Sequence, residues 1–164
     1  AVNKAEPSLI RTEADELTYC LHIMVRYEIE KMLMEKTIPI RDVPAVWNRL
    51  MREYLGVCVP DDRRGALQDS HWSGGSMGYF PSYALGNAYA AQIMRRMKKD
   101  VDVDAAVRAG DLSPVVSWLT EHIYRFGSLY DPMELFERCC GEAFDPDCYL
   151  DYLTEKYSAI YGLR

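Results

Sequence analysis

The pattern of apolar positions predicts that the chain opens with one long helix. Between residues 8 and 36, apolar side chains recur at steps of three and four residues, which places them on one helical face. The members of this face are Ile10, Ala14, Leu17, Leu21, Met24 and Val25. Ser8 lies where an N-cap is expected, and Pro39 lies beyond the last turn. We therefore expect a helix of about 28 residues, much longer than the roughly 11–12 residues of an average helix.

The rest of the chain has the start and stop signals of shorter helices. Asp42 and Gly56 bracket one helix, which has Pro44 in its first turn, and Ser113 is expected to cap another. The further helices are expected over residues 83–100, 102–110, 112–127, 131–141 and 145–162. No alternating apolar and polar run requires a strand. The prediction is an all-α chain, with one long N-terminal helix and several shorter helices in a single domain over residues 1–164.

Composition narrows the class of protein. With 164 residues, of which 49% are hydrophobic, the chain can bury a core of ordinary size. The formal net charge of −6 argues against nonspecific binding to nucleic acid or anionic membranes. No apolar run approaches the roughly 18 residues that span a bilayer, and no secretory signal opens the chain. The five cysteines are odd in number, include the adjacent Cys139 and Cys140, and form no CxxC pair. Because this is neither a disulfide framework nor a zinc-ribbon pattern, a reducing compartment is favoured. We expect a cytoplasmic protein with no nucleic-acid or membrane partner.

The histidines do not form a metal-binding motif. His22, His71 and His122 are far apart in the sequence, and none belongs to an HExxH motif. His22 and His122 lie within amphipathic segments, where partly buried, hydrogen-bonded helix residues are the simpler interpretation. The sequence therefore predicts no metal site within this chain.

Arg11 and Asp15 are four residues apart in the stretch IRTEAD. On a helix they would face each other, and the simpler interpretation is a surface ion pair that contributes little stability. The functional interpretation is that Asp15 holds the Arg11 guanidinium as a fixed fork, which can bind another carboxylate with two hydrogen bonds.

The segment over residues 63–83 combines glycines with polar and aromatic side chains, among them Gln68, Asp69, His71, Tyr79 and Tyr83. Histidine and tyrosine can donate hydrogen bonds to a developing oxyanion, and glycines let a loop approach a ligand closely. The alternative is a well-packed aromatic loop that joins two helices. The residues alone do not decide between the two.

Three stretches together carry a family resemblance: IRTEAD from residue 10, GALQDSHW from residue 65 and GYFPSYALGN from residue 78. The first two match the motifs IRxxAD and GxxQDxHW at every specified position, and the chain resembles the carboxypeptidase Taq family of zinc metallocarboxypeptidases along essentially its whole length. The resemblance implies the C-terminal third of such an enzyme. The family's zinc ligands, HExxH and a downstream glutamate, are expected outside this chain, with zinc or another divalent metal such as cobalt as the cofactor.

The resemblance also implies roles for the residues singled out above. Arg11 is expected to bind the free C-terminal carboxylate of a peptide substrate, with Asp15 orienting its guanidinium. His71 and either Tyr83 or Tyr79 are expected to stabilise the oxyanion, with Tyr83 preferred. Gln68 and Asp69 are expected to position the loop or His71. Family membership further implies a homodimer, and the 164-residue chain alone is expected to be inactive.

Two other functions stay open at this point. The chain could be a non-catalytic helical module for dimerisation or partner binding that uses its tyrosine-rich C-terminal helices. It could also be a stand-alone hydrolase that uses His71 with Asp69, although no serine or cysteine is matched to that pair.

Overall fold

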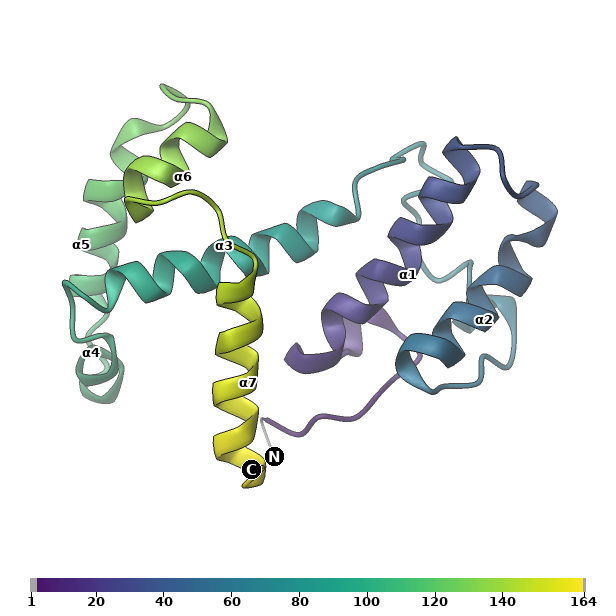
Figure 1. Cartoon of the computed structure of the whole chain (residues 1–164), viewed down its shortest axis with the longest axis horizontal. Helices are drawn as coiled ribbons and strands as arrows, with labels where there is room; N and C mark the ends of the chain where they lie inside the picture. Colours follow the sequence, from purple (N-terminus) through teal and green to yellow (C-terminus); the bar gives the residue numbers. More distant parts are fainter. Residues whose placement is uncertain (1–2, 164) are drawn as a thin grey trace. The chain divides into compact units, whose positions relative to one another are not determined.

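The structure, a computed structural model, describes residues 3–163. Within that range there are seven α-helices, four short 3-10 helices and no strand, which confirms the all-α prediction (Figure 1). The α-helices are α1 (Glu16–Met34), α2 (Val43–Leu55), α3 (Pro81–Met97), α4 (Val103–Ala109), α5 (Ser113–His122), α6 (Pro132–Cys140) and α7 (Asp147–Tyr161). The 3-10 helices are η1 (Arg11–Glu13), η2 (Ile40–Asp42), η3 (Asp62–Arg64) and η4 (Tyr124–Phe126).

The chain divides into two compact units, Ala1–Leu85 and Gly86–Arg164, called here the first and the second unit. Helix α3 contributes residues to both. All the predicted site residues fall within the first unit. The single domain that the sequence suggested stays a prediction.

Helices α1 and α2 form the core of the first unit, lying side by side (Figure 1). Val25 and Ile29 of α1 pack with Trp47, Leu50 and Met51 of α2, and each of these five side chains is at most 3% exposed. Burying a side chain of this size contributes about 1.5–3 kcal/mol. This core supplies the rigid support for the loop that follows α2.

The predicted boundaries of α2 are correct. Asp42 occupies the N-cap position, although its side chain makes no capping hydrogen bond, and a proline lies in the first turn. Gly56 ends the helix with φ +68°, a left-handed conformation that glycine adopts without steric cost.

The first helix is shorter than predicted. It has 19 residues and begins at Glu16, because the chain before it forms the 3-10 turn η1 and an extended Ala14. The N-cap is Asp15, whose carboxylate accepts hydrogen bonds from the Thr18 backbone N at 3.0 Å and the Thr18 Oγ1 at 3.1 Å. The prediction that Ser8 caps this helix is wrong.

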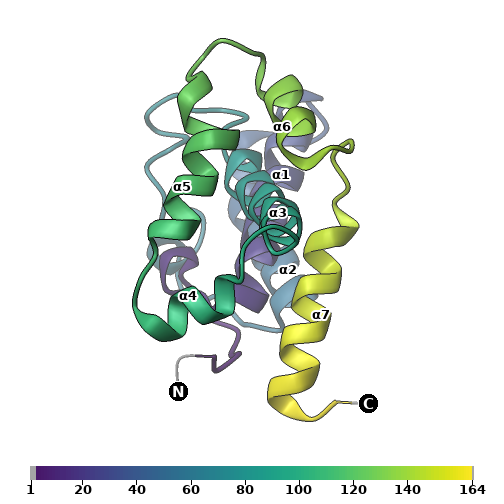
Figure 2. The ribbon, with the colours of Figure 1, turned by 90° about the vertical axis from the view of Figure 1, so that its left-hand side faces the viewer.

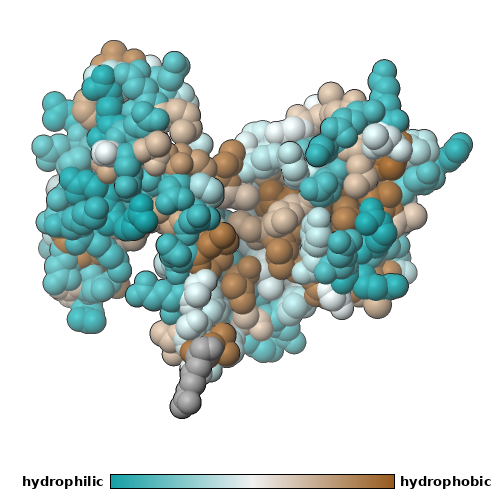
Figure 3. Space-filling model, viewed as in Figure 1, coloured by the Kyte–Doolittle hydropathy of each residue, from teal (hydrophilic) through white to brown (hydrophobic). Residues whose placement is uncertain are grey.

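The predicted buried face of α1 is also partly wrong. Leu17 and Met24 are 38% and 45% exposed, and with Tyr27 and Met34 they form an apolar stripe open to solvent. On the face shown in Figure 3, hydrophobic side chains lie over α1. The buried side of α1 carries a second, polar set of residues at four-residue spacing: Thr18, His22, Arg26 and Glu30. We call these four residues the polar stripe.

The second unit packs around the C-terminal half of α3. Its core joins Met97 of α3, Val103 at the start of α4, Trp118 of α5 and Cys139 of α6. Figure 2 looks along α3, with α5 and α7 on either side of it. The fully buried Gln92 ties α3 to the segment before α7: its Nε2 donates to the Ala143 carbonyl, and its Oε1 accepts from the Asp145 backbone N, both at 2.9 Å.

The helices of the second unit fall within two or three residues of the predicted ranges, with one exception. The helix expected over 112–127 ends at His122, and η4 follows it. Ser113 is the first residue of α5 and Leu112 is its N-cap, so the predicted cap is displaced by one position. Across residues 3–163, no helix combines the length and the apolar character needed to cross a membrane.

Candidate functional site

The carboxylate of Asp69 lies between two arginines at the centre of the candidate site. Its Oδ1 accepts from Arg11 Nη2 at 2.8 Å and from Arg11 Nε at 3.3 Å. Its Oδ2 accepts from Arg26 Nε at 2.7 Å and also from Arg26 Nη2. The Arg26 side chain is fully buried, and the side chains of Arg11 and Asp69 are 9% and 11% exposed. Two cations therefore share one carboxylate, an arrangement that fixes all three side chains.

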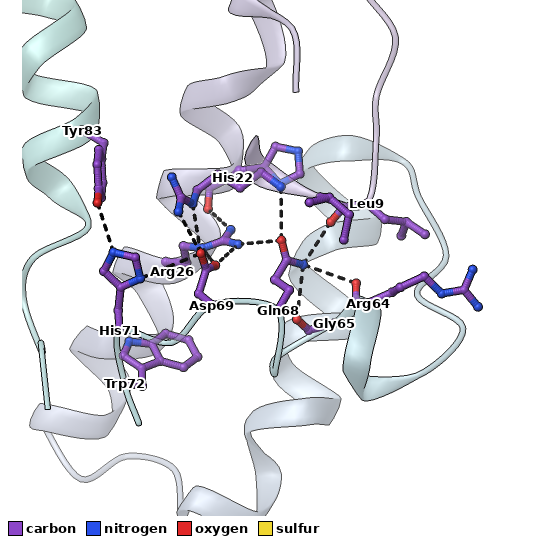
Figure 4. Close-up of polar contacts among 12 residues, drawn as sticks. Leu9, His22, Arg26, Arg64, Gly65, Gln68, Asp69, His71, Trp72 and Tyr83 are labelled. Carbon is purple, nitrogen blue, oxygen red and sulfur yellow. Dashed lines mark hydrogen bonds and ion pairs between the residues drawn. The ribbon is translucent and has the colours of Figure 1, made fainter. Parts of the chain in front are cut away.

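Gln68 connects the same two arginines to the backbone. Its Oε1 accepts from the Arg11 backbone N at 3.1 Å and from Arg26 Nη2 at 3.0 Å. Its Nε2 donates to the Leu9 carbonyl at 3.0 Å and to the Gly65 carbonyl at 3.2 Å (Figure 4). Gln68 thus joins the segment before α1 to the loop after α2, with both ends of its amide in use.

Arg11 keeps part of its hydrogen-bonding capacity. Besides the bonds to Asp69, its Nη1 donates to the Tyr19 hydroxyl at 3.2 Å. A guanidinium has five N–H groups, and three of those of Arg11 have partners among residues 3–163, which leaves one N–H on each terminal nitrogen. The guanidinium carbon lies 4.9 Å from the centre of the Tyr83 ring, so one face of the group is also held.

His71 and Tyr83 form a hydrogen-bonded pair beside Arg11. His71 Nε2 lies 3.1 Å from the Tyr83 hydroxyl, as Figure 4 shows. The imidazole packs against Phe80, with ring centres 4.4 Å apart, and stacks on Tyr79 at 5.9 Å. His71 Nδ1 is 3.9 Å from Asp69 Oδ1, beyond ordinary hydrogen-bond length. The structure thus brings together Arg11, Asp69, His71, Tyr79 and Tyr83 from two segments of the chain.

The predicted pairing of Arg11 with Asp15 is wrong. Arg11 lies in η1 and Asp15 caps α1, so the two residues are not on one helical turn. The carboxylate that orients Arg11 is that of Asp69, 58 residues away in the sequence. Asp15 supports the site indirectly, since it fixes where α1 begins and also accepts from the Glu6 backbone N at 2.8 Å.

Sequence reasoning missed the polar stripe on α1. Arg26 holds Asp69, and Glu30 Oε1 accepts from Trp72 Nε1 at 2.9 Å and from the Gly78 backbone N at 3.0 Å. The sequence does contain a signal for this stripe, because its polar residues recur every four positions and so lie on one helical face. It was overlooked because apolar residues on the other face were taken to mark the buried side.

Electrostatics stabilise the charged forms of the central pair. Burial favours a neutral Asp69, but the hydrogen bonds from Arg11 and the charge of Arg26 outweigh burial and hold the pKa of Asp69 below its ordinary value. Burial likewise opposes the charge on Arg11, but hydrogen bonds to Asp69 and Tyr19 outweigh it and raise the Arg11 pKa. Burial lowers the pKa of Arg26 to about 10, which still leaves it charged at neutral pH.

His22 is the neutral member of the polar stripe. The side chain is fully buried, and neither ring nitrogen has a hydrogen-bond partner within the described chain. Burial, followed by the charges of Arg26 and Arg11, lowers the pKa of His22 from its ordinary value of 6.5 to about 4. The predicted burial of His22 is correct, but the predicted hydrogen bonding is not.

Metal-ligating side chains do not cluster in the described part of the chain. Among residues 3–163, no three histidine, cysteine, aspartate or glutamate side chains come close enough together to hold a metal ion. The carboxylate nearest His71 is already shared by two arginines.

Comparison with known proteins identifies similar chains. A model of the carboxypeptidase Taq (M32) metallopeptidase family matches residues 1–157. Carboxypeptidase 1 of Bacillus subtilis is 44% identical over 164 residues, which is 99% of this chain and 33% of that protein. Thermostable carboxypeptidase 1 of Thermus thermophilus is also 44% identical, over 99% of this chain and 32% of its own length.

Solved structures of carboxypeptidases also resemble this chain. The M32 carboxypeptidase of Deinococcus radiodurans R1 superposes with a TM-score of 0.95 at 40% identity, over 99% of this chain and 33% of that chain. Trypanosoma cruzi metallocarboxypeptidase 1 has a TM-score of 0.92 at 42% identity, over 95% of this chain and 33% of that one. The chain thus spans about a third of the length of the relatives it matches.

Replacing Asp69 by asparagine should strongly destabilise the first unit. Asp69→Asn removes the negative charge between two buried guanidinium groups, and breaking a buried ion pair costs about 3–5 kcal/mol. Asp61→Asn is the matched control, because Asp61 lies in the same loop and pairs with Arg64 at the exposed surface. We expect the control to change the free energy of unfolding in urea far less than Asp69→Asn does, because an exposed ion pair contributes little stability. Similar losses for the two variants would contradict this account.

His22 should make stability depend on pH. In the folded chain it stays neutral down to a pKa of about 4, whereas in the unfolded chain it binds a proton below its ordinary value of 6.5. Stability should therefore fall as the pH drops from 6.5 toward 4. Between pH 7 and pH 5, the free energy of unfolding of the wild type should fall by about 2 kcal/mol more than that of His22→Leu. Parallel pH curves for the two proteins would show that His22 is not the group responsible.

Proposed function

The chain belongs to the carboxypeptidase Taq (M32) metallopeptidase family, and on that premise we propose that it supplies one wall of a carboxypeptidase active site. This wall binds the free C-terminal carboxylate of a peptide and the oxyanion that forms at its last peptide carbonyl. The chain corresponds in this proposal to the C-terminal part of the enzyme, and alone it is inactive.

The observation that carries the proposal is the pair of unused donors on Arg11. The Nε and Nη2 side of the guanidinium is occupied by Asp69, and the group cannot turn because Tyr19 and the Tyr83 ring also hold it. One N–H remains on each terminal nitrogen, and such a pair can bind both oxygens of a carboxylate. A second anion also suits the charge of the cluster, in which two arginines contact a single carboxylate.

Tyr83 and His71 are the proposed oxyanion donors. The Tyr83 ring lies against the Arg11 guanidinium and its hydroxyl is hydrogen-bonded to His71, so the carboxylate fork and the oxyanion donors are adjacent. A peptide whose C-terminus is held by Arg11 would have its last carbonyl close to these donors, which would stabilise the charge that develops on the oxygen. Tyr79 is 52% exposed and contacts His71 by stacking only, which favours Tyr83 over Tyr79.

The remaining parts of the proposal concern the metal, the substrate, the oligomeric state and the cellular compartment. The metal, zinc or another divalent ion such as cobalt, would be held by other residues of the enzyme. The substrates are peptides with a free C-terminus. The exposed apolar stripe of α1 suits packing against further protein, and a homodimer is part of the proposal. No disulfide bond links any of the five cysteines in the described part of the chain, which suits the reducing cytoplasm.

A chimera can test this function directly. The corresponding third of Bacillus subtilis carboxypeptidase 1 would be replaced by this chain, which is 44% identical to it over 164 residues. The chimera should release C-terminal amino acids from peptides, while the 164-residue chain alone should release none. A folded chimera without activity would contradict the proposed function.

Within the active chimera, Arg11→Ala should weaken substrate binding. We expect KM for peptides with a free C-terminus to rise by about 10- to 100-fold, because a charge-assisted pair of hydrogen bonds is lost. Because the Tyr83 ring also packs on the Arg11 guanidinium, kcat should fall as well, but by a smaller factor. Arg11→Lys keeps the charge but not the fork, and should give an intermediate KM. Peptides with an amidated C-terminus are the control, and their slow cleavage should fall only by that smaller factor. An unchanged KM for free peptides would show that Arg11 does not bind the carboxylate.

Tyr83→Phe should instead slow the chemical step. Removing one oxyanion donor costs about 100- to 1,000-fold in kcat, and KM should stay within a few fold of the wild-type value. Tyr79→Phe makes the same change four residues earlier, in the loop before α3, and is the matched control. A larger loss of kcat in Tyr79→Phe would reverse the assignment of the two tyrosines.

A further inference from the structure

One buried glutamate holds both ends of an exposed loop. Residues 73–79 are exposed. Even so, Trp72 and Gly78, the two ends of the segment 72–78, donate to the same atom. That atom is Oε1 of Glu30, at 2.9 Å from Trp72 Nε1 and 3.0 Å from the Gly78 backbone N. Glu30 is 4% exposed, so these bonds are sheltered from water.

The bonds to Glu30 attach this loop to α1. Within the loop, Ser76 N donates to the His71 carbonyl at 2.8 Å, and Gly75 N donates to the Trp72 carbonyl at 3.1 Å. These bonds give the loop a shape but do not attach it to α1. Trp72 is further fixed by edge-on contacts with Trp47 and Phe80, whose ring centres lie 6.0 Å and 5.9 Å away.

The two attachment points adjoin the residues proposed for the chemistry. His71 precedes Trp72, and Tyr79 follows Gly78. A shift of either end of the loop would therefore move a neighbouring side chain of the His71, Tyr79 and Tyr83 cluster. Within the described part of the chain, Glu30 forms no hydrogen bond with any of these three side chains, so its effect on them would act through the loop.

We propose that Glu30 is a positioning residue, whose single carboxylate oxygen closes the segment 72–78 onto α1 and thereby sets where His71 and Tyr79 lie. Oε2 of Glu30 has no hydrogen-bond partner in the described part of the chain, so the acceptor function of Oε1 is the feature that matters. The catalytic consequence rests on the proposed function, whereas the closure of the loop does not.

The loop closure is tested first on the 164-residue chain without any activity assay. In Glu30→Ala, the indole N–H of Trp72 and the amide of Gly78 should exchange with solvent at least about tenfold faster by NMR. Glu30→Gln keeps an acceptor of the same length and should retain most of the protection. Glu28→Ala, on the same helix, is the control and should leave both signals unchanged. The indole N–H of Trp118, bonded to Asp100 in the second unit, is an internal reference.

The catalytic consequence is tested in the chimera. Glu30→Ala should lower kcat by about tenfold or more with little change in KM, because Arg11 is untouched while the oxyanion donors are displaced. Glu30→Gln should restore most of kcat. An inactive wild-type chimera would remove the proposed function but leave the exchange measurement to decide the role of Glu30.

Two results would overturn the proposal. Unchanged exchange at Trp72 and Gly78 in Glu30→Ala would show that the loop does not depend on this residue. Equally fast exchange in Glu30→Gln and Glu30→Ala would show that the acceptor is not what holds it. If Glu30→Ala does not fold, Glu30→Asp replaces it, because its shorter side chain cannot reach both donors and should speed exchange at one of them at least.

Discussion

The carboxylate of Asp69 joins three segments of the first unit that are far apart in the sequence. Arg11 comes from the turn before α1, Arg26 from the middle of that helix, and Asp69 itself from the loop after α2. Gln68, its neighbour, bonds to the same two arginines and extends the connection to the backbone. The positions of Tyr83 and His71 depend on this junction, since Tyr83 packs on the Arg11 guanidinium and His71 lies two residues from Asp69. Buried ion pairs add little net stability, but they permit few geometries. The junction is therefore better understood as a device that fixes positions than as a source of stability.

The site carries its charges on a helix that would otherwise have an apolar interior. Val25 and Ile29 of α1 pack into the core with α2, while Arg26 and Glu30, each one residue further on, point toward the loop. The charges are tolerated because each has specific partners: Arg26 bonds to Asp69, Gln68 and the His22 carbonyl, and its guanidinium lies 4.7 Å from the centre of the Trp47 ring. His22 needs no such partner because it is uncharged at neutral pH. The outer side of the same helix leaves Leu17, Met24, Tyr27 and Met34 exposed. The pattern of apolar and polar positions therefore does not by itself show which side of α1 is buried.

Features that depend on a few neighbouring residues could be predicted from the sequence, whereas contacts between distant segments could not. Gly56 ends α2, and Asp102 and Gly110 bracket α4, because caps and left-handed glycines act within a few residues. The motif residues Arg11, Gln68, Asp69 and His71 were singled out because their types and order resemble a known family. Their partners were not predictable in the same way. The bond between Arg11 and Asp69 spans 58 residues, and no local spacing indicates it, whereas the spacing of Arg11 and Asp15 suggested a pair that the 3-10 turn prevents. Arg26 and Glu30 were missed because the apolar residues on the other face of α1 were taken to mark its buried side, although the four-residue spacing of the polar residues was visible in the sequence.

The glycines around the candidate site indicate a tightly held loop rather than a freely moving one. Arg26 and Glu30 are one helical turn apart on α1, separated by about 6 Å along its axis. The first holds Asp69, and the second holds Trp72 and Gly78, so successive parts of the loop are attached to successive turns of one helix. Gly75 and Gly78 have φ angles of +81° and +76°, conformations that glycine adopts without strain and that allow the chain to reverse between two attachment points so close together. His71 and Tyr79 can therefore be held in place on a segment without regular secondary structure, and Tyr83 follows in the first turn of α3. The loop is held by its bonds to α1, and the turns within the loop direct its side chains toward Arg11.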